Sequence, residues 1–231
     1  MSFQDFYNQE FIEWSKRNYE ALVNRHDDRR VMKIITRRYG RFKWMMDDVS
    51  LEDYTRNVFG KISGHDPEVL MTYMKDPKKE NIAEKSQVKY MSNNIPGIII
   101  NRLSTKSKSV DNDGNIIDGC NSKCKSIDFE IHGHNNYFGF LKYTEESGGA
   151  QDNQFMDAQN FLAHALENTD ECYFIIILDG GYYQKKAKNG VFKGTTRLNY
   201  LKSLVSNNKK IIIGTTDEVV DIVNQLENAG Q

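Results

Sequence analysis

The sequence predicts an α+β fold in which a mixed sheet is flanked by helices and preceded by a helical N-terminal region. Three observations support this prediction. Apolar residues recur at three- and four-residue spacing through much of the first half, whereas in residues 127–131 they alternate with carboxylates, which is the period of a strand. Two short apolar runs, residues 173–178 and 210–214, are separated by a helical stretch, which favours parallel pairing in a covered sheet with α/β alternation.

The N-terminal elements are predicted from helical periodicity and capping residues. Gly40 is a natural helix stop, and Asp66 is a typical N-cap because Pro67 follows at the first helical position. We expect residues 1–92 to form a helical region and residues 93–231 to form a core, the two making one compact unit. Helices are expected over residues 6–19, 19–39, 51–59 and 69–75.

The core is predicted to contain a hairpin, followed by helices and strands that alternate along the chain. Residues 105–125 are rich in Lys, Ser, Asn, Asp and Gly, which predicts a long loop or hairpin. The turn 132–136 then joins strands 127–131 and 137–143. The remaining predictions are helices over residues 154–166, 196–206 and 216–226, with strands over residues 173–178 and 210–214.

The composition is that of a globular protein without a membrane segment. Of the 231 residues 27% are charged, and the longest purely apolar run is far too short to span a bilayer. The N-terminus lacks a basic segment followed by an apolar one, so we expect a cytoplasmic protein without a secretory signal. Three cysteines without a dense framework predict reduced thiols. A zinc site is disfavoured because the ligand spacing does not fit; it would comprise Cys120, Cys124, His132 and His134.

Basic residues are concentrated in one N-terminal segment. Between Lys16 and Lys43 there are ten basic residues and three acidic ones, although the whole chain has a net charge of -1. Such a local field suits a polyanion. The alternative is that these side chains only solvate the outer face of an amphipathic helix. The predicted phosphate contacts are Arg29, Arg30, Arg37 and Arg38, with Lys185 and Lys186 in a later basic stretch.

Two carboxylates and a lysine are expected on paired strands. Strand alternation would turn Asp128 and Glu130 to one face, and the following strand would bring Lys142 beside them. Such carboxylates bind Mg²⁺ through oxygen, and the metal with the lysine can activate water and stabilise charge on a phosphate. The alternative is a pair of surface carboxylates on a half-exposed strand. No P-loop, dinucleotide-binding or serine-hydrolase motif occurs in the chain.

This arrangement resembles the PD-(D/E)xK nuclease superfamily, in particular type II restriction endonucleases and the cleavage domains of type IIS enzymes. The resemblance covers residues 120–216 and rests on Ile127-Asp128, where the family has Pro-Asp, and on Lys142 as the motif lysine, with Gly148-Gly149 leading into a helix. It implies a restriction-endonuclease-like fold and Mg²⁺-dependent hydrolysis of double-stranded DNA. For a palindromic site it further implies a homodimer.

One position departs from the family pattern. The family has an acid two residues before the lysine, where this chain has Phe140. The second carboxylate would then come from Glu130, or from Glu145 or Glu146 beyond the lysine. The alternative is a scaffold that binds DNA or another partner without cutting. A further carboxylate, Asp179, ends the run 173–178 and is either a functional group or a turn residue.

The polar segment after Gly148-Gly149 offers contacts to bases. Gln151 and Gln154 carry amides that can donate and accept at once, as reading an adenine edge in the major groove requires. The alternative is a glycine turn in which Asp152 or Asn153 caps the helix 154–166.

Overall fold

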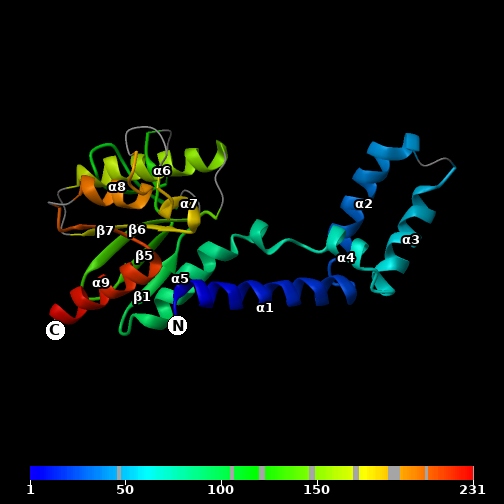
Figure 1. The fold of residues 1–231 in the computed structure, drawn as a ribbon, viewed down its shortest axis with the longest axis horizontal. Coiled ribbons are helices and arrows are strands. Elements are labelled where there is room, and N and C mark those ends of the chain that lie inside the picture. Colours follow the sequence, from blue (N-terminus) through cyan, green and yellow to red (C-terminus); the bar gives the residue numbers. More distant parts are fainter. Residues whose placement is uncertain are drawn as a thin grey trace. The chain divides into compact units, whose positions relative to one another are not determined.

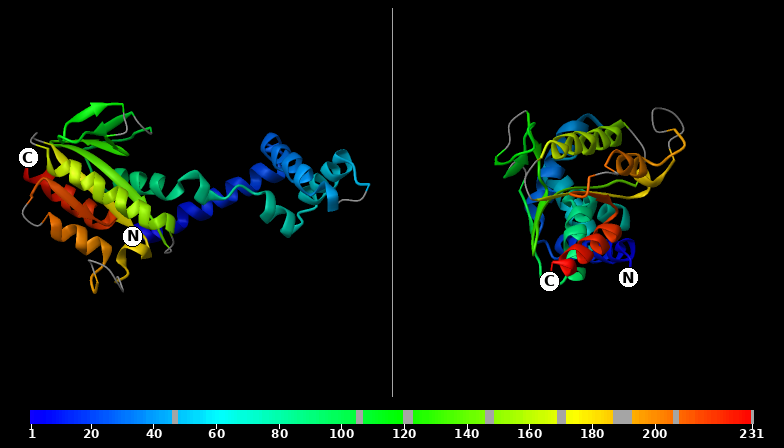
Figure 2. Two further views of the ribbon diagram at one scale, coloured as in Figure 1. Left: turned by 90° about the horizontal axis from the view of Figure 1, so that it is seen from above. Right: turned by 90° about the vertical axis from the view of Figure 1, so that its left-hand side faces the viewer.

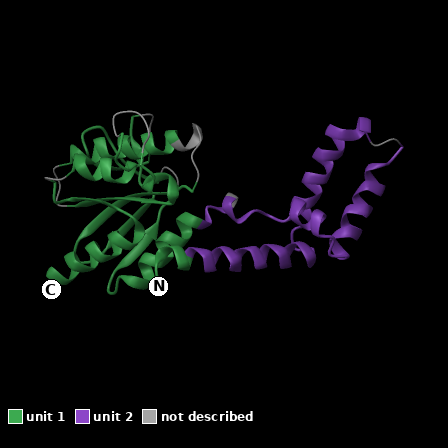
Figure 3. Ribbon diagram, viewed as in Figure 1, with its two compact units in different colours: residues 1–6, 83–231 green, residues 7–82 purple. Residues whose placement is uncertain are grey.

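The computed structural model divides the chain into two compact units. It describes residues 1–45, 48–104, 107–119, 123–145, 149–168, 172–186, 193–205 and 208–230 (Figure 1). Residues 1–6 and 83–231 form one unit, which we call the sheet unit, and residues 7–82 form the other, which we call the helical unit (Figure 3). The division falls earlier than the predicted boundary at residue 92, because nearly all of helix α5 (Ile82–Asn94) belongs to the sheet unit.

The helical unit has a small apolar core of its own. Val31 and Ile35 lie one turn apart on α2 and are fully buried, and they pack with Ile62 and Tyr73 from the following helices. The predicted cap at Asp66 is present, because its carboxylate accepts from the Val69 N–H at 3.1 Å. The helices are α1 (Phe3–Val23), which begins in the sheet unit, α2 (Asp28–Phe42), α3 (Leu51–Ser63) and α4 (Pro67–Tyr73), with short 3-10 turns at Lys43–Met45 and Pro77–Glu80.

Two predicted helix boundaries in this region are wrong. The helix expected over residues 19–39 is interrupted between Val23 and Asp28, where Arg25 has a positive φ of 62°. Helix α2 also continues through Gly40, because a glycine without a positive φ can remain in a helix at a cost of only about 0.5–1 kcal/mol.

The sheet unit contains the predicted mixed sheet. Its strand order is β1-β5-β6-β7-β8; β5 pairs antiparallel with both β1 and β6, whereas β7 pairs parallel with both β6 and β8. The strands are β1 (Ile99–Arg102), β5 (Phe129–His132), β6 (Asn136–Tyr143), β7 (Tyr173–Asp179) and β8 (Ile211–Gly214). A small three-stranded sheet, β2 (Lys108–Val110), β3 (Ile116–Asp118) and β4 (Lys125–Ser126), lies within the segment expected to be a loop or hairpin.

Helices cover both faces of the five-stranded sheet (Figure 1, Figure 2). On one face, Phe161 of α6 and Leu201 of α8 are fully buried against apolar side chains of β6, β7 and β8. Helices α9 and α5 lie on the other face. This arrangement confirms the predicted α+β class with flanking helices and an N-terminal helical region. The bounds are α6 (Gly149–Leu166), α7 (Gly181–Gln184), α8 (Arg197–Leu204) and α9 (Thr216–Ala229).

Helices α5 and α6 differ from the sequence prediction. Helix α5 was not expected at all. Helix α6 begins at Gly149, so Asp152 and Asn153 lie inside its first turns and neither is the N-cap of a helix that begins at Gln154. Among the described helices none is both long and apolar enough to cross a bilayer.

Candidate active site at the sheet edge

The ends of three central strands meet at one edge of the five-stranded sheet. β6 and β7 run parallel with Tyr143 opposite Asp179, so both strands end at this edge. β5 is antiparallel to β6 and therefore begins at the same edge. Open sheets commonly place functional groups at the carboxyl ends of their parallel strands. Side chains from β5, β6 and β7 can therefore act together at this edge.

Asp128 lies immediately before β5 and is fixed there by the backbone. Its N–H donates to the Gly139 carbonyl at 2.8 Å, and its own carbonyl accepts from the Leu103 N–H at 2.9 Å. Its side-chain Oδ2 accepts from the Leu141 N–H at 3.1 Å. The same oxygen lies 3.7 Å from Nζ of Lys142. The hairpin therefore brings the Asp128 carboxylate and the Lys142 ammonium together.

A second carboxylate reaches Lys142 from helix α5. Glu84, in the first turn of this helix, places Oε1 3.3 Å from Nζ of Lys142. Its other oxygen, Oε2, accepts from Nη2 of Arg102 at 3.2 Å. The lysine ammonium is thus held between two carboxylates, one from a helix and one from the start of a strand. We call Glu84, Asp128 and Lys142 the acid–lysine site.

The acid–lysine site is partly open to solvent. The three side chains keep 23–27% of their surface exposed, so a ligand can reach them. Burial raises the pKa of Asp128. The Lys142 ammonium and the hydrogen bond from the Leu141 N–H oppose this rise, whereas the Glu84 carboxylate adds to it. Because its surroundings on balance disfavour the charged form of Asp128, an additional cation beside this carboxylate would favour its ionised form.

Glu130 belongs to a different ion-pair cluster. Its side chain is buried, with Oε2 2.5 Å from Nζ of Lys108 on β2 and Oε1 3.3 Å from Nε2 of His132. Burial alone would raise the pKa of Glu130, but the hydrogen bonds from Lys108 and His132 outweigh it and the pKa is lowered. The expectation that Glu130 is the second carboxylate beside Lys142 is therefore corrected. Asp128 precedes the first residue of β5, so strand alternation does not group it with Glu130.

The other positions considered for the second carboxylate have different surroundings. Glu145, just past β6, accepts a hydrogen bond from the tyrosine hydroxyl two residues earlier, and Glu146 lies outside the described residues. Phe140 is a core residue whose ring stacks on Phe161 with centroids 5.4 Å apart. The Lys142 ammonium lies 5.0 Å from the centroid of the Phe140 ring. An aromatic ring thus lies where the family pattern has an acid.

A third carboxyl group, Asp179, is enclosed behind the same edge. Its Oδ2 accepts from Nε2 of Gln87 at 2.6 Å and from Oγ1 of Thr216 at 2.5 Å, and its Oδ1 accepts from the Thr216 N–H at 3.1 Å. Burial raises the pKa of Asp179 to about 6 in spite of these donors. Gln87 lies one turn after Glu84 on α5, and its Nε2 is also 3.5 Å from the Lys142 carbonyl. Asp179 therefore ties β7 to α5 and α9 through Gln87 and Thr216.

The residues predicted to contact bases and phosphates in the sheet unit are only partly described. Oε1 of Gln154 accepts from the Thr144 hydroxyl at 2.6 Å, which ties this amide to the chain just past β6. The side chain of Gln151 lies outside the described part of the chain. Lys185 and Lys186 follow α7 and are exposed, whereas residues 187–192 of the predicted basic stretch are not described.

The four predicted arginines lie on α2 and fall into two classes. Arg29 and Arg37 are exposed. Arg30 bonds to a carboxylate at 2.5 Å and to the Tyr73 carbonyl at 2.5 Å. The Arg38 guanidinium lies 5.1 Å from the centroid of the Tyr73 ring. The expectation that Arg30 and Arg38 contact phosphates is corrected, because both face the interior of the helical unit and hold α2 against α4.

The donor set at the sheet edge fits magnesium better than zinc. Cys124 and Cys172 are buried, and Cys120 is not described. Within the described residues no group of three or more His, Cys, Asp or Glu side chains could hold a metal ion. The acid–lysine site supplies two carboxylates. That number suits Mg²⁺, which proteins usually bind through one or two carboxylates together with water and substrate phosphate.

Comparison with known proteins gives a weak structural likeness. No family model matches the chain, and no curated protein matches it. The crystal structure of protein VC1899 from Vibrio cholerae is similar over 97% of this chain and 57% of that protein, with 8% sequence identity and a TM-score of 0.32. The chain thus spans a little over half the length of VC1899. A likeness of this size assigns neither a family nor a function.

Proposed function

We propose that this chain is a metal-dependent endonuclease that hydrolyses phosphodiester bonds in double-stranded DNA. The observation that carries the proposal is the acid–lysine site, in which two carboxylates hold one lysine at the open edge of a mixed sheet. The order of elements around it, hairpin β5–β6, helix α6 and buried parallel strand β7, is the order on which the resemblance to PD-(D/E)xK nucleases rests. Compared with the sequence hypothesis, Glu84 takes the place of Glu130 as the second acid.

Each group of the acid–lysine site has a defined part in this proposal. Asp128 and Glu84 would hold Mg²⁺, which when bound supplies a Lewis acid and lowers the pKa of a coordinated water. Lys142 would place its ammonium beside the scissile phosphate, where it balances charge that develops during attack. The Leu141 N–H already orients the Asp128 carboxylate, and Arg102 orients the Glu84 carboxylate. Substrate binding would therefore cost little further side-chain entropy at these two groups.

A non-cleaving module that binds DNA or another partner is the second candidate. Phe140 favours it, because the position of the family's acid is filled by a ring packed into the core. In such a module Glu84 and Asp128 would only neutralise Lys142.

For the cleaving enzyme we further propose a homodimer if its DNA site is palindromic, because the two-fold symmetry of such a site must be matched by the protein.

Plasmid digestion separates the two candidates. The wild-type protein should cut plasmid DNA with Mg²⁺ and leave it intact with EDTA. Asp128→Asn and Lys142→Met keep the side-chain size but remove a charge, and each should slow cleavage by on the order of 10²–10³-fold while binding in EDTA persists. A gel shift without any cleavage by the wild type would support the non-cleaving module. Wild-type cleavage rates in both variants would refute the assignment of the acid–lysine site.

A further inference from the structure

Helix α2 carries a row of cations that packing does not use. Its members recur every four residues, so they follow one face of the helix with a rise of about 6 Å from one to the next. All of them are exposed. The row is distinct from the buried stripe of Val31 and Ile35 and from the inward-facing Arg30 and Arg38. We call it the α2 cation row; it comprises Arg29, Lys33, Arg37 and Arg41.

The charge of the α2 cation row is not balanced by the acids next to it. Asp27 pairs with Arg30 at 2.5 Å, and Asp28 pairs with Arg25 at 2.6 Å. Within the described ranges no ion pair involves a member of the row. The surface beside it is hollowed by a groove of about 610 Å³ that is lined by Arg29, Lys33 and Arg37 among others. The row is therefore an open positive surface that can receive an extended anion.

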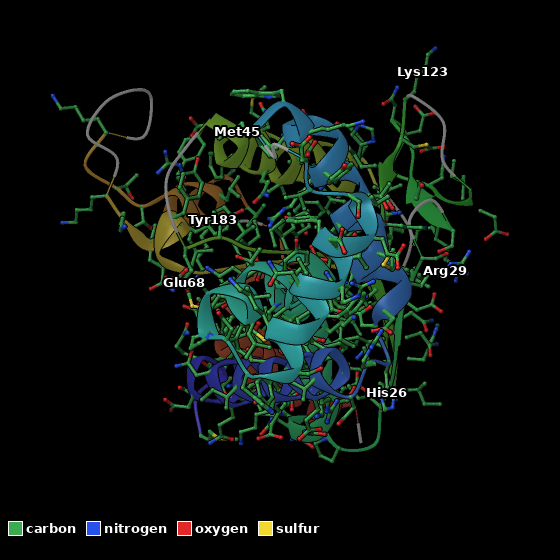
Figure 4. All side chains as sticks on the ribbon, turned by 90° about the vertical axis from the view of Figure 1, so that its right-hand side faces the viewer. His26, Arg29, Met45, Glu68, Lys123 and Tyr183 are labelled. Atoms are coloured by element: carbon green, nitrogen blue, oxygen red, sulfur yellow. The ribbon has the colours of Figure 1, made fainter. Side chains whose placement is uncertain are left out.

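The apolar residues at the C-terminal end of α2 are also exposed. Trp44 is 77% exposed and Met45 is 62% exposed, both on the 3-10 turn that follows the helix. A groove of about 460 Å³ lies next to this end, lined by Arg37, Arg41 and aromatic side chains of Phe42 and Tyr54 among others. Figure 4 labels Arg29 and Met45, which mark the two ends of this surface. The cations of α2 and the exposed Trp44 thus adjoin at the C-terminal end of this helix.

We propose that the α2 cation row and Trp44 form a nucleic-acid-binding surface that works independently of the acid–lysine site. The row would contact backbone phosphates, and Trp44 would pack against a base or sugar at the end of the row. Charge complementarity selects this occupant, because four unpaired cations along one helix face match a regular polyanion. A membrane-binding helix would instead expose apolar residues along its whole length, whereas here they are confined to one end. The choice of double-stranded DNA as the partner rests on the proposed function.

Salt-dependent DNA binding tests this surface. A variant with R29Q, K33Q, R37Q and R41Q is compared with a control that removes the same charge elsewhere in the helical unit, at four other exposed cations, through K16Q, R56Q, K61Q and K78Q. Both are made in the Asp128→Asn background and measured in EDTA by fluorescence anisotropy of a labelled duplex. The slope of log affinity against log salt should fall by about 3–4 units in the row variant and remain at the parental value in the control.

Trp44 supplies a second measurement. In the Trp14→Phe variant, Trp44 is the remaining tryptophan, and its fluorescence should be quenched when duplex DNA is added. Trp44→Ala should weaken binding about 10-fold without changing the salt slope, because packing of the indole against the duplex removes apolar surface from water and involves no counterion release. Circular dichroism checks that each variant is folded.

The outcomes also distinguish this surface from the proposed cleavage site. Equal salt slopes in the row variant and the control would overturn the proposal, as would a row variant that loses binding to anionic phospholipid vesicles but keeps binding to DNA. If the salt slope falls as expected in the row variant but the wild-type protein never cleaves DNA, the binding surface is supported and only the proposed nuclease activity is refuted.

Discussion

Replacing Asp179 with Asn should remove a large pH dependence from the stability of the sheet unit. Asp179 is 5% exposed, and burial raises the pKa of its carboxyl group to about 6. The reference pKa is 3.8, so the difference of about two units corresponds to roughly 3 kcal/mol. Because the folded state holds this proton more tightly, the stabilisation is fully present below pH 3.8 and is lost as the pH rises through 6. Asparagine has no proton to lose.

The hydrogen-bond network around Asp179 can accept the amide. Oδ1 receives the Thr216 N–H, and an asparagine oxygen can keep that bond. The new amide nitrogen would face Gln87, whose Oε1 is buried without a hydrogen-bond partner among the described residues. A rotation of the Gln87 amide would turn that oxygen towards the new donor. The substitution should therefore change the pH dependence of stability without dismantling the network.

Hydrogen exchange of the β7 amides measures this effect. The difference in opening free energy between Asp179→Asn and the wild type should shift by roughly 2–2.5 kcal/mol in favour of the variant as the pH rises from 4 to 7. Contributions from other titrating groups cancel in this difference when their surroundings are unchanged. A difference that stays constant within about 0.5 kcal/mol would refute the reasoning and show that Thr216 and Gln87 keep Asp179 ionised throughout.

Two further substitutions test the packing around the hairpin. Glu227→Gln should lower the free energy of unfolding by about 1–3 kcal/mol, because the buried carboxylate accepts from Tyr137 Oη at 2.6 Å and from two backbone N–H groups of the β5–β6 turn. These hydrogen bonds outweigh burial and lower the pKa of Glu227. The stabilisation by the carboxylate should therefore be present above pH 4.5 and be lost as the pH falls, which urea unfolding at several pH values can check. Phe140→Glu should lower stability by about 3–5 kcal/mol through loss of its stacking on Phe161, measured by thermal denaturation. A gain in cleavage by the same variant would instead show that the site lacks an acid.

The elements with strong local patterns could be predicted from the sequence. Residues 173–178 read as a buried strand because all-apolar runs of that length suit a covered parallel sheet, and β7 lies there. Helix α9 begins at Thr216, as predicted, and Thr215 and Glu218 form a capping box at its start. Helix α5 was missed for a physical reason. Its buried face includes Ser86 and Gln87, so apolar periodicity does not reveal it.

The candidate site could be predicted only as far as local geometry extends. Asp128 and Lys142 meet through one hairpin, whose register follows from the alternation of its strands. Glu84 reaches Lys142 from a distant helix, which depends on tertiary packing that no local pattern encodes. Which side chains of α2 face inward likewise depends on where the helix begins after the interruption near Arg25. The sequence alone therefore could not separate the exposed arginines from the inward-facing ones.

We propose that Glu84, and not Glu130, is the second carboxylate of the site at Lys142. The most direct measurement compares single-turnover plasmid cleavage by Glu84→Gln and Glu130→Gln at saturating Mg²⁺, with thermal denaturation as the check on folding. We expect Glu84→Gln to slow cleavage by on the order of 10²-fold or more while the protein remains stable. Glu130→Gln should lose stability with its Lys108 ion pair but cleave at close to the wild-type rate below its melting temperature. A folded Glu130→Gln without activity, beside a fully active Glu84→Gln, would contradict the account.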